Sequence, residues 1–371
     1  MGSKGFHEKE FPETTKTKLA LFRGYLEAWL PVFLNNHNSY STIQVYDFFA
    51  GPGTDAEGND GSPLIAIKEI EAALETNKDR LSTTLRIRLI LNDHDSQKAI
   101  RLRESISQRQ FKYADVSVEV YDKPFAELFA LEKPKMRTKA TANLIFIDQF
   151  GISEVSKELF ADIASTPSTD VLFFTSSAIV NRMKDHPSIQ SHIPSLSDSE
   201  LAKMNGKNVH RILSRSYRHW LPPRCDYYLG DFSLKNRSNV YGLVFGSRHI
   251  LGILKFLTVA WNLSGTGDAN YDIDDDHIDH ETPYLFDAFN KPTKIKEFES
   301  NLRKGIKEKQ FRTNFDILRF TVENGMLPKH AKEAFQEAIQ ANELPKQSLG
   351  SFATCWKFGS QAKIVYNGEK S

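Results

Sequence analysis

Cysteine, surplus charge and long apolar runs are all scarce in this chain of 371 residues. Its two cysteines, Cys225 and Cys355, are too few for a disulfide framework or a cysteine-based zinc site, which indicates a reducing, cytoplasmic setting. The longest apolar stretches, such as residues 171–174 and 251–261, are too short or too interrupted to span a bilayer. We therefore expect a soluble, cytoplasmic protein without a membrane partner.

The positive and negative charges of the chain nearly cancel. There are 48 lysine and arginine residues against 47 aspartate and glutamate residues, which gives a net charge of +1. This balance excludes bulk attraction to nucleic acid, so any nucleic-acid binding has to come from a local patch. The ordinary numbers of glycine and proline, 20 and 15, exclude collagen-like and wholly disordered chains.

Strand-like and helical segments alternate through the first half of the chain. An amphipathic helix is expected from Lys16 to about Phe33, with Pro31 marking its end. Five β-rich runs then each precede a helical stretch, and these runs occupy residues 43–49, 85–91, 116–121, 143–148 and 171–175. The helical stretches cover residues 62–74 and 96–107, begin near residues 124 and 153, and cover residues 178–183. Five consecutive βα units predict a parallel sheet with helices on both faces.

The sixth and seventh strands are expected to be antiparallel neighbours. A polar turn at residues 235–239 separates the strand-like runs at 226–231 and 240–245, which is the pattern of a hairpin. Five parallel units that end in an antiparallel hairpin are typical of class I methyltransferases and less typical of dehydrogenases. The predicted fold class is therefore a Rossmann-like class I methyltransferase fold, with a seven-stranded mixed sheet and a helical insertion at about residues 186–223.

The composition changes sharply after an apolar helical run at residues 250–261. Residues 272–281 carry six acidic side chains and no lysine or arginine, whereas residues 294–312 carry seven basic and three acidic side chains. Two helices, at 313–324 and 328–341, then precede a hairpin made by 352–358 and 362–366, and this order resembles a winged-helix domain. We divide the chain into a helical extension (1–40), a Rossmann-like domain (41–265), a charged linker and helix (266–312) and a winged-helix-like domain (313–371).

The acidic segment at 272–281 is also the strongest candidate for a metal site. Oxygen ligands at alternate positions, such as Asp272, Asp274 and Asp276, suit Ca²⁺ or Mg²⁺. The glycine and the terminal glutamate of an EF-hand loop are missing, however. We therefore expect a solvated acidic loop and predict no metal site.

Candidate binding residues follow the first strand, at the edge where doubly wound sheets bind ligands. Residues 47–53 have the sequence DFFAGPG. Gly51 and Gly53 allow a tight turn and a close approach to a ligand, and Phe49 comes just before them. Asp47, near the end of the strand, can meet a ligand's ammonium group. The alternative is a Rossmann-like domain in which the two glycines only shape a turn.

Two further acidic residues follow the next two strands. Asp93 is placed where a carboxylate can accept both hydroxyl protons of a ribose diol, and Asp122 could meet an adenine amino group. The glycine spacing is not GxGxxG, which weakens a nicotinamide interpretation, and the absence of GxxxxGK[ST] excludes a P-loop. The glycine turn, the two acids and a motif after the fourth strand, taken in order, predict binding of an S-adenosylmethionine-type cofactor.

The fourth strand ends in the sequence FIDQFG at residues 146–151. In amino-group methyltransferases this position accepts the target amine's protons and stacks an aromatic ring on a flipped base, roles that suit Asp148 and Phe150, with the Gln149 carbonyl nearby. Arg182, after the fifth strand, could hold a substrate phosphate or carboxylate, or form a surface ion pair. Asp148 could instead cap the helix that follows its strand. Cytosine-C5 chemistry is excluded because no cysteine nucleophile follows this strand.

Short motifs spread along the chain carry a family resemblance. They are KTK at 16–18, DFFAGPG at 47–53, GSPL at 61–64, IDQFG at 147–151 and NYD at 270–272. Together they resemble the three-Cys-motif partner proteins over nearly the whole chain, which implies a methyltransferase-like fold. The resemblance also implies a radical-type iron–sulfur partner that carries the three cysteines, and a bacterial, phage or mobile-element setting in DNA modification, repair or defence. The family's strand-four motif is usually Asp-Pro-Phe-Gly, so Gln149 departs from it.

Three functions follow from these patterns. The first is an S-adenosylmethionine-dependent methyltransferase that acts on nucleic acid, at a base amino group in DNA. The second is a non-catalytic adaptor that delivers nucleic acid to its partner, and the third is a nucleotide hydrolase or another Rossmann-like enzyme. The basic residues of 294–312 could neutralise phosphates while the second winged-helix segment enters a major groove, although such domains also dock proteins.

Overall fold

A computed structural model describes ten stretches of the chain. They are residues 10–34, 40–81, 84–107, 115–148, 154–176, 216–223, 225–236, 239–263, 293–357 and 359–368. The helix expected at 178–183, most of the insertion expected at 186–223 and the acidic segment at 272–281 lie outside these stretches. The chain forms two compact units, residues 1–255 and 256–371, and each is described by itself.

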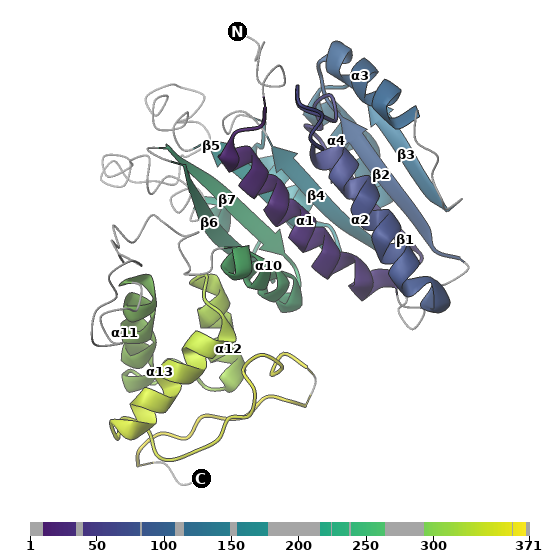
Figure 1. The fold of residues 1–371 in the computed structure, drawn as a ribbon. Coiled ribbons are helices and arrows are strands. Elements are labelled where there is room, and N and C mark those ends of the chain that lie inside the picture. The colour runs from purple at the N-terminus through teal and green to yellow at the C-terminus, as the bar shows by residue number, and fades with distance from the viewer. Residues whose placement is uncertain are drawn as a thin grey trace. The chain divides into compact units, whose positions relative to one another are not determined.

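A seven-stranded mixed sheet forms the centre of the first unit (Figure 1). Its strand order is β3-β2-β1-β4-β5-β7-β6; the first five strands are parallel, and β7 is antiparallel to both β5 and β6. The strands are β1 (Thr42–Asp47), β2 (Arg86–Asn92), β3 (Val116–Tyr121), β4 (Thr141–Asp148), β5 (Thr169–Ser176), β6 (Tyr228–Asn236) and β7 (Asn239–Ser247). Each of the seven predicted strands overlaps one of these, and the predicted methyltransferase-like topology is confirmed.

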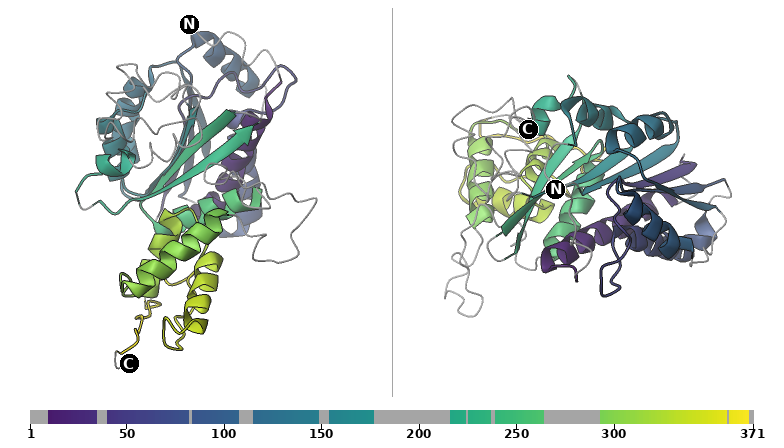
Figure 2. Two further views of the ribbon diagram at one scale, coloured as in Figure 1. Left: turned by 90° about the vertical axis from the view of Figure 1, so that its left-hand side faces the viewer. Right: turned by 90° about the horizontal axis from the view of Figure 1, so that it is seen from above.

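Helices cover both faces of this sheet (Figures 1 and 2). They are α1 (Glu13–Leu34), α2 (Ser62–Asn77), α3 (Ser96–Ser107), α4 (Phe125–Met136), α5 (Lys157–Ser165) and α10 (Ile250–Leu263), with a short 3₁₀ turn, η1 (Lys78–Arg80), after α2. Because side chains alternate along a strand, Ile145 and Ile147 of β4 belong to the core beneath α4 and α5, whereas Phe146 packs on Phe22 of α1. None of the helices in the described stretches is both long and apolar enough to cross a membrane.

Two helix boundaries differ from the sequence predictions. Pro31 does not end α1, which continues to Leu34. A proline removes a single backbone hydrogen bond, and the buried side chains of Trp29, Leu30 and Leu34 hold the last turn against the sheet. The helix expected from about residue 153 is described only from Lys157, where Ser156 caps α5 by accepting a hydrogen bond from the Leu159 N–H at 3.2 Å.

The second unit is built around three helices. These are α11 (Thr293–Lys307), α12 (Asn314–Glu323) and α13 (Pro328–Gln340). Thr313 caps α12 through a capping box with Asp316, and Gly325 follows the helix with a φ of 70°. Phe298 of α11, Ile317 of α12 and Phe335 of α13 share one core, so α11 packs with the other two helices.

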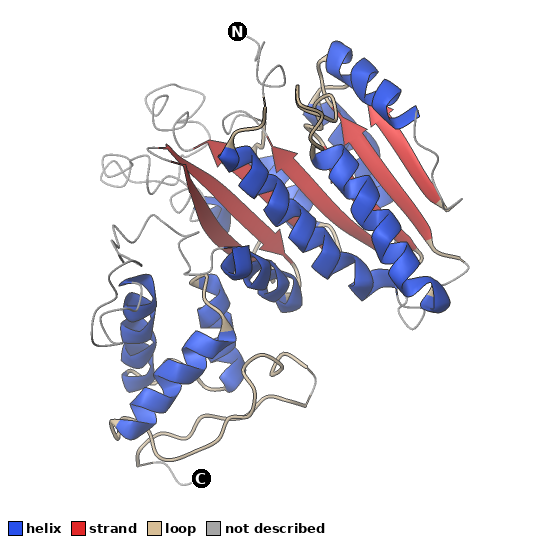
Figure 3. Ribbon diagram, viewed as in Figure 1, coloured by secondary structure: helices blue, strands red, loops and turns tan. Residues whose placement is uncertain are grey.

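The predicted hairpin after α13 is wrong. In the described residues of this segment, 349–357 and 359–368, the chain forms turns and loop, which Figure 3 draws in tan. The segment pairs by its backbone with the residues before α12, in an isolated antiparallel bridge between Thr313 and Lys363. Polar side chains add further bonds: the Ala362 N–H donates to Asn314 Oδ1 at 2.9 Å, and the Gln347 side chain donates to and accepts from the Val365 backbone. Asn314 is fully buried, so the segment is held by this bridge and by the core of the unit, and not by the second strand of a hairpin.

Candidate functional site

Acidic side chains gather at the carboxyl ends of the central strands. Asp47 is the last residue of β1, and Asp148 is the last residue of β4. Asp47 pairs in register with Phe146, so Asp148 lies two residues further along β4 on the same face as Phe146. That face is the one against which α1 packs, because Phe22 of α1 contacts Phe146 with ring centroids 4.4 Å apart. The sheet therefore directs both carboxylates towards α1.

Asp47 is buried with half of its carboxylate unsatisfied. One oxygen, Oδ1, accepts a hydrogen bond from the Phe49 N–H at 3.2 Å, whereas Oδ2 has no hydrogen-bond partner among the described residues. Burial, together with the charges of Asp148 and Asp93, raises the pKa of Asp47 to about 7, although the nearby Ser62 hydroxyl and the hydrogen bond from the Phe49 N–H oppose this rise. A buried oxygen without a partner is costly, and a cationic group would satisfy it.

The two glycines of the predicted turn have the conformations that glycine favours. Gly51 has a φ of 63° and Gly53 a φ of 95°, values that other residues rarely adopt. The Gly51 N–H donates to Asp93 Oδ2 at 3.1 Å, and the other oxygen of Asp93 accepts from the Asp95 N–H at 3.0 Å. Asp93 is 6% exposed, so its carboxylate ties the turn after β1 to the turn after β2.

A third glycine closes this turn. The Gly61 N–H donates to the Gly53 carbonyl oxygen at 2.7 Å, and a Cβ at Gly61 would lie 2.9 Å from the same oxygen. We expect Gly61→Ala to push the Gly53 carbonyl away and to lower the free energy of unfolding by about 2 kcal/mol, measured by urea denaturation. Gly58→Ala is the control: Gly58 has a φ of 81° but no atom within 4 Å of an added Cβ. Gly58→Ala thus measures the cost of a positive φ alone, typically about 1 kcal/mol, whereas Gly61 has a φ of −81° that any residue adopts, so an unchanged stability of Gly61→Ala would show that the close approach is unimportant.

Two residues that hold the turns of the site by hydrogen bonds were not predicted from the sequence. Asp55 accepts hydrogen bonds from the backbone N–H groups of Phe11, Glu57 and Asn59 at 2.8, 3.0 and 2.8 Å. Asn92, the last residue of β2, donates to the carbonyl oxygens that follow β1 and β3 at 3.1 and 3.0 Å. The short spacing from Asp55 to Glu57 and Asn59 is typical of a side chain that closes its own turn, which could have indicated Asp55.

Lys18 of α1 reaches Asp148 and forms an ion pair with its Oδ2. The Lys18 side chain is 16% exposed and that of Asp148 is 29% exposed, so the pair is half-buried. The Lys18 ammonium also lies 5.6 Å from the centre of the Phe174 ring on β5. The alternative role of Asp148, capping the next helix, is wrong, since Ser156 caps α5.

The remaining predicted site residues divide into two groups. Phe49 is half-buried and packs its ring 5.5 Å from that of Phe125, centre to centre. Asp122 is exposed, and its carboxylate lies 3.7 Å from the Arg103 guanidinium. The roles suggested for both stay predictions. The other group lies outside the described residues and consists of Gln149, Phe150 and Arg182.

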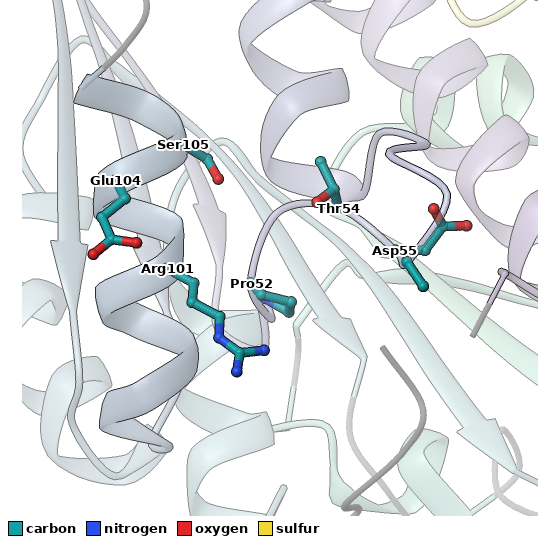
Figure 4. A pocket seen from close by; sticks show the side chains of 7 residues that line it. Pro52, Thr54, Asp55, Arg101, Glu104 and Ser105 are labelled. Carbon is teal, nitrogen blue, oxygen red and sulfur yellow. The ribbon is translucent and has the colours of Figure 1, made fainter. Parts of the chain in front are cut away.

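An open groove lies beside the glycine turn. It has a volume of about 370 Å³ and separates α3, which contributes Arg101, Glu104 and Ser105, from the loop at residues 52–56 (Figure 4). Its lining is mainly polar, and Pro52, Thr54 and Asp55 face it from the loop. None of the residues predicted to bind a cofactor is among those that line it, although Pro52 and Thr54 flank Gly53.

Comparison with known proteins identifies one part of the chain. A family model described as a GMT-like wHTH domain, a winged helix-turn-helix, matches residues 270–348. No curated protein matches the sequence. The chain is similar to a solved structure of the O-methyltransferase TomG from Streptomyces achromogenes, involved in tomaymycin synthesis, in complex with SAM. The identity is 13% and the TM-score 0.31, over 66% of this chain and 98% of that one. By its strand order and by the family match, the chain combines a methyltransferase-like fold with a winged helix-turn-helix domain.

Proposed function

We propose that the chain is an S-adenosylmethionine-dependent methyltransferase that acts on nucleic acid, at a base amino group in DNA. The observation that carries this proposal is the buried oxygen of Asp47, which has no partner in the described part of the chain and lies beside the Gly51–Gly53 turn. A ligand with an ammonium group could satisfy the Asp47 oxygen at the end of β1, and a ribose on the same ligand could reach Asp93 after β2. S-adenosylmethionine has both groups.

The residues around the turn fit the parts of this cofactor. Asp47 would bind the ammonium group, Asp93 the ribose hydroxyls and Asp122 the adenine amino group. Gly51 and Gly53 would let the backbone approach the ligand, with Phe49 alongside. The bound cofactor supplies a methyl group already activated on a sulfonium, so the protein needs only to position the acceptor.

Asp148 is the residue we assign to the acceptor. Its carboxylate would accept a hydrogen bond from the target amine and hold the nitrogen lone pair towards the methyl group. Gln149 and Phe150 follow it directly in the chain, and we propose that the Gln149 carbonyl assists while Phe150 stacks on a flipped base. Arg182 would hold a phosphate of the substrate.

The winged helix-turn-helix match supports nucleic acid as the substrate. In the second unit, exposed basic side chains of α11 and the residues after it could contact phosphates, among them Lys296 and Arg312. The α13 helix is the one that would enter a major groove. By the resemblance to three-Cys-motif partner proteins, we propose a radical-type iron–sulfur protein as partner, in a bacterial mobile-element, repair or defence setting.

A specific observation favours a second function, that of a non-catalytic adaptor. Lys18 occupies an oxygen of Asp148 that a target amine would need, and Gln149 replaces the proline of the family motif. In an adaptor, the same fold would carry nucleic acid to the partner without methyl transfer.

Calorimetric titration with S-adenosylmethionine, and separately with its demethylated product, tests the cofactor assignment. We expect micromolar binding by the natural protein and about 10-fold weaker binding by Asp93→Asn, which keeps an acceptor for the Gly51 N–H but loses the charge that faces the ribose. The control is Asp79→Asn, the same change at an exposed position on η1. Absence of heat and of thermal stabilisation with both ligands would refute the proposed methyltransferase.

A further inference from the structure

Two lysines at the start of α1 have different surroundings. Lys16 lies on the exposed side and pairs with Glu10 and Glu13 at 2.8 and 3.0 Å. Lys18 turns towards the sheet, where its ammonium meets Asp148 and lies over the Phe174 ring. The helix therefore brings one cation, Lys18, to the carboxyl ends of β4 and β5.

Contacts along the N-terminal segment fix this placement of Lys18. Ahead of the helix, the Phe11 N–H donates to Asp55 of the glycine loop at 2.8 Å. One turn after Lys18, Phe22 packs on Phe146, and further on the Tyr25 hydroxyl donates to the buried Asp170 carboxylate at 2.7 Å. The start of α1 is thus anchored both to the glycine loop and to the centre of the sheet.

The Lys18 ammonium has N–H donors that are not used by the described residues. An ammonium group carries three N–H donors, and in the described stretches of the chain Lys18 makes one hydrogen bond, to Asp148. The opposite deficiency lies at the end of the neighbouring strand: Asp47 pairs in register two residues before Asp148, and its Oδ2 is a buried acceptor without a donor among the described residues. A spare cationic donor and a spare anionic acceptor at one edge of the sheet match the two charges of an α-amino acid group.

We propose that Lys18 binds the carboxylate of the cofactor's methionyl group while Asp47 binds its ammonium. This inference rests on the proposed function, because it assigns a ligand group of the same cofactor. The N-terminal helix is then part of the cofactor site, and Asp148 holds the Lys18 side chain in place for that contact.

The test compares S-adenosylmethionine with its decarboxylated analogue in calorimetric titrations of the natural protein, Lys18→Met and Lys16→Met. The natural protein and Lys16→Met should prefer S-adenosylmethionine. In Lys18→Met, the affinity for S-adenosylmethionine should fall about 10- to 100-fold, whereas the affinity for the decarboxylated analogue should stay within about threefold. Methionine keeps the length and apolar contacts of the lysine stem, and circular dichroism would verify that the variant is folded. Lys18→Arg should retain the preference.

The outcomes separate this inference from the proposed function. If Lys18→Met binds S-adenosylmethionine as well as the natural protein does, or loses both ligands equally, Lys18 does not contact the carboxylate and the inference fails while the cofactor assignment stands. If the natural protein binds neither ligand, the proposed function fails and the inference fails with it. Loss of the preference in Lys18→Met alone is the result that supports it.

Discussion

Asp47→Asn should make the folded protein more stable above neutral pH while weakening its binding of S-adenosylmethionine about 100-fold. The natural side chain is 1% exposed, one of its oxygens has no partner among the described residues, and two other carboxylates act on it. An asparagine removes the buried charge, and its amide can donate to a neighbouring carboxylate. It cannot attract an ammonium group as a carboxylate does, so cofactor affinity falls.

The gain in stability should depend on pH in a defined direction. Asp47 titrates near pH 7 in the folded chain and at its ordinary value of 3.8 in the unfolded chain. Between these values the folded state holds the extra proton, so the stability of the natural protein falls as the pH rises from about 4 to 7 and levels off above that. The advantage of Asp47→Asn should therefore grow over this interval and reach about 1–3 kcal/mol at pH 8.

Urea denaturation at pH 5 and pH 8, together with calorimetric titration at pH 8, measures both effects. In the natural protein, affinity for the cofactor should also decline as the pH is lowered below about 7, because the proton on Asp47 competes with the ammonium group. A variant that loses stability equally at both pH values, or that binds the cofactor normally, would show that Asp47 is a structural carboxylate and not a ligand.

The fold could be predicted because its signals are local. Each strand of the sheet is a short apolar run, and each parallel strand is followed by a helical pattern, so neighbouring residues decide the element. The antiparallel order of β6 and β7 followed from the short polar turn between them. The hairpin predicted after α13 was wrong because the last segment is bonded to distant positions in the chain, to the backbone at Thr313 and to the side chains of Asn314 and Gln347.

The residues of the candidate site also divide into those that a sequence pattern indicated and those that it did not. Asp47 and Asp93 could be found from the sequence because parallel strands end at one edge of the sheet, which brings residues that follow them together. Lys18 carried no such signal: it precedes the first strand, and its place depends on how Phe22 and Tyr25 pack α1 on the sheet. A lysine two residues away, Lys16, has the same local sequence features and lies on the exposed side.

Asp148→Asn should reduce methyl transfer at least 100-fold, whereas cofactor affinity should fall less than in Lys18→Met, because the amide oxygen can still accept a hydrogen bond from Lys18. The carboxylate is assigned to the target amine. Asparagine still offers an accepting oxygen but cannot take up the amine's proton, and loss of a positioned general base typically costs a factor of 10² to 10⁴ in rate. Transfer of a radiolabelled methyl group from S-adenosylmethionine to single-stranded and double-stranded DNA measures the rate. Calorimetry on the same samples measures the affinity.

The matched control is Asp162→Asn, which breaks a comparable pair. Asp162 of α5 is 36% exposed and lies 2.5 Å from the Lys133 ammonium and 3.3 Å from the Arg137 guanidinium, so the change weakens ion pairs of similar exposure outside the site. We expect this variant to transfer methyl groups at the natural rate. If Asp148→Asn also keeps the natural rate, Asp148 serves only to hold Lys18. If the natural protein binds S-adenosylmethionine and DNA but transfers no methyl group, the adaptor is the better account, because the Lys18–Asp148 pair then closes the position that a target amine would occupy.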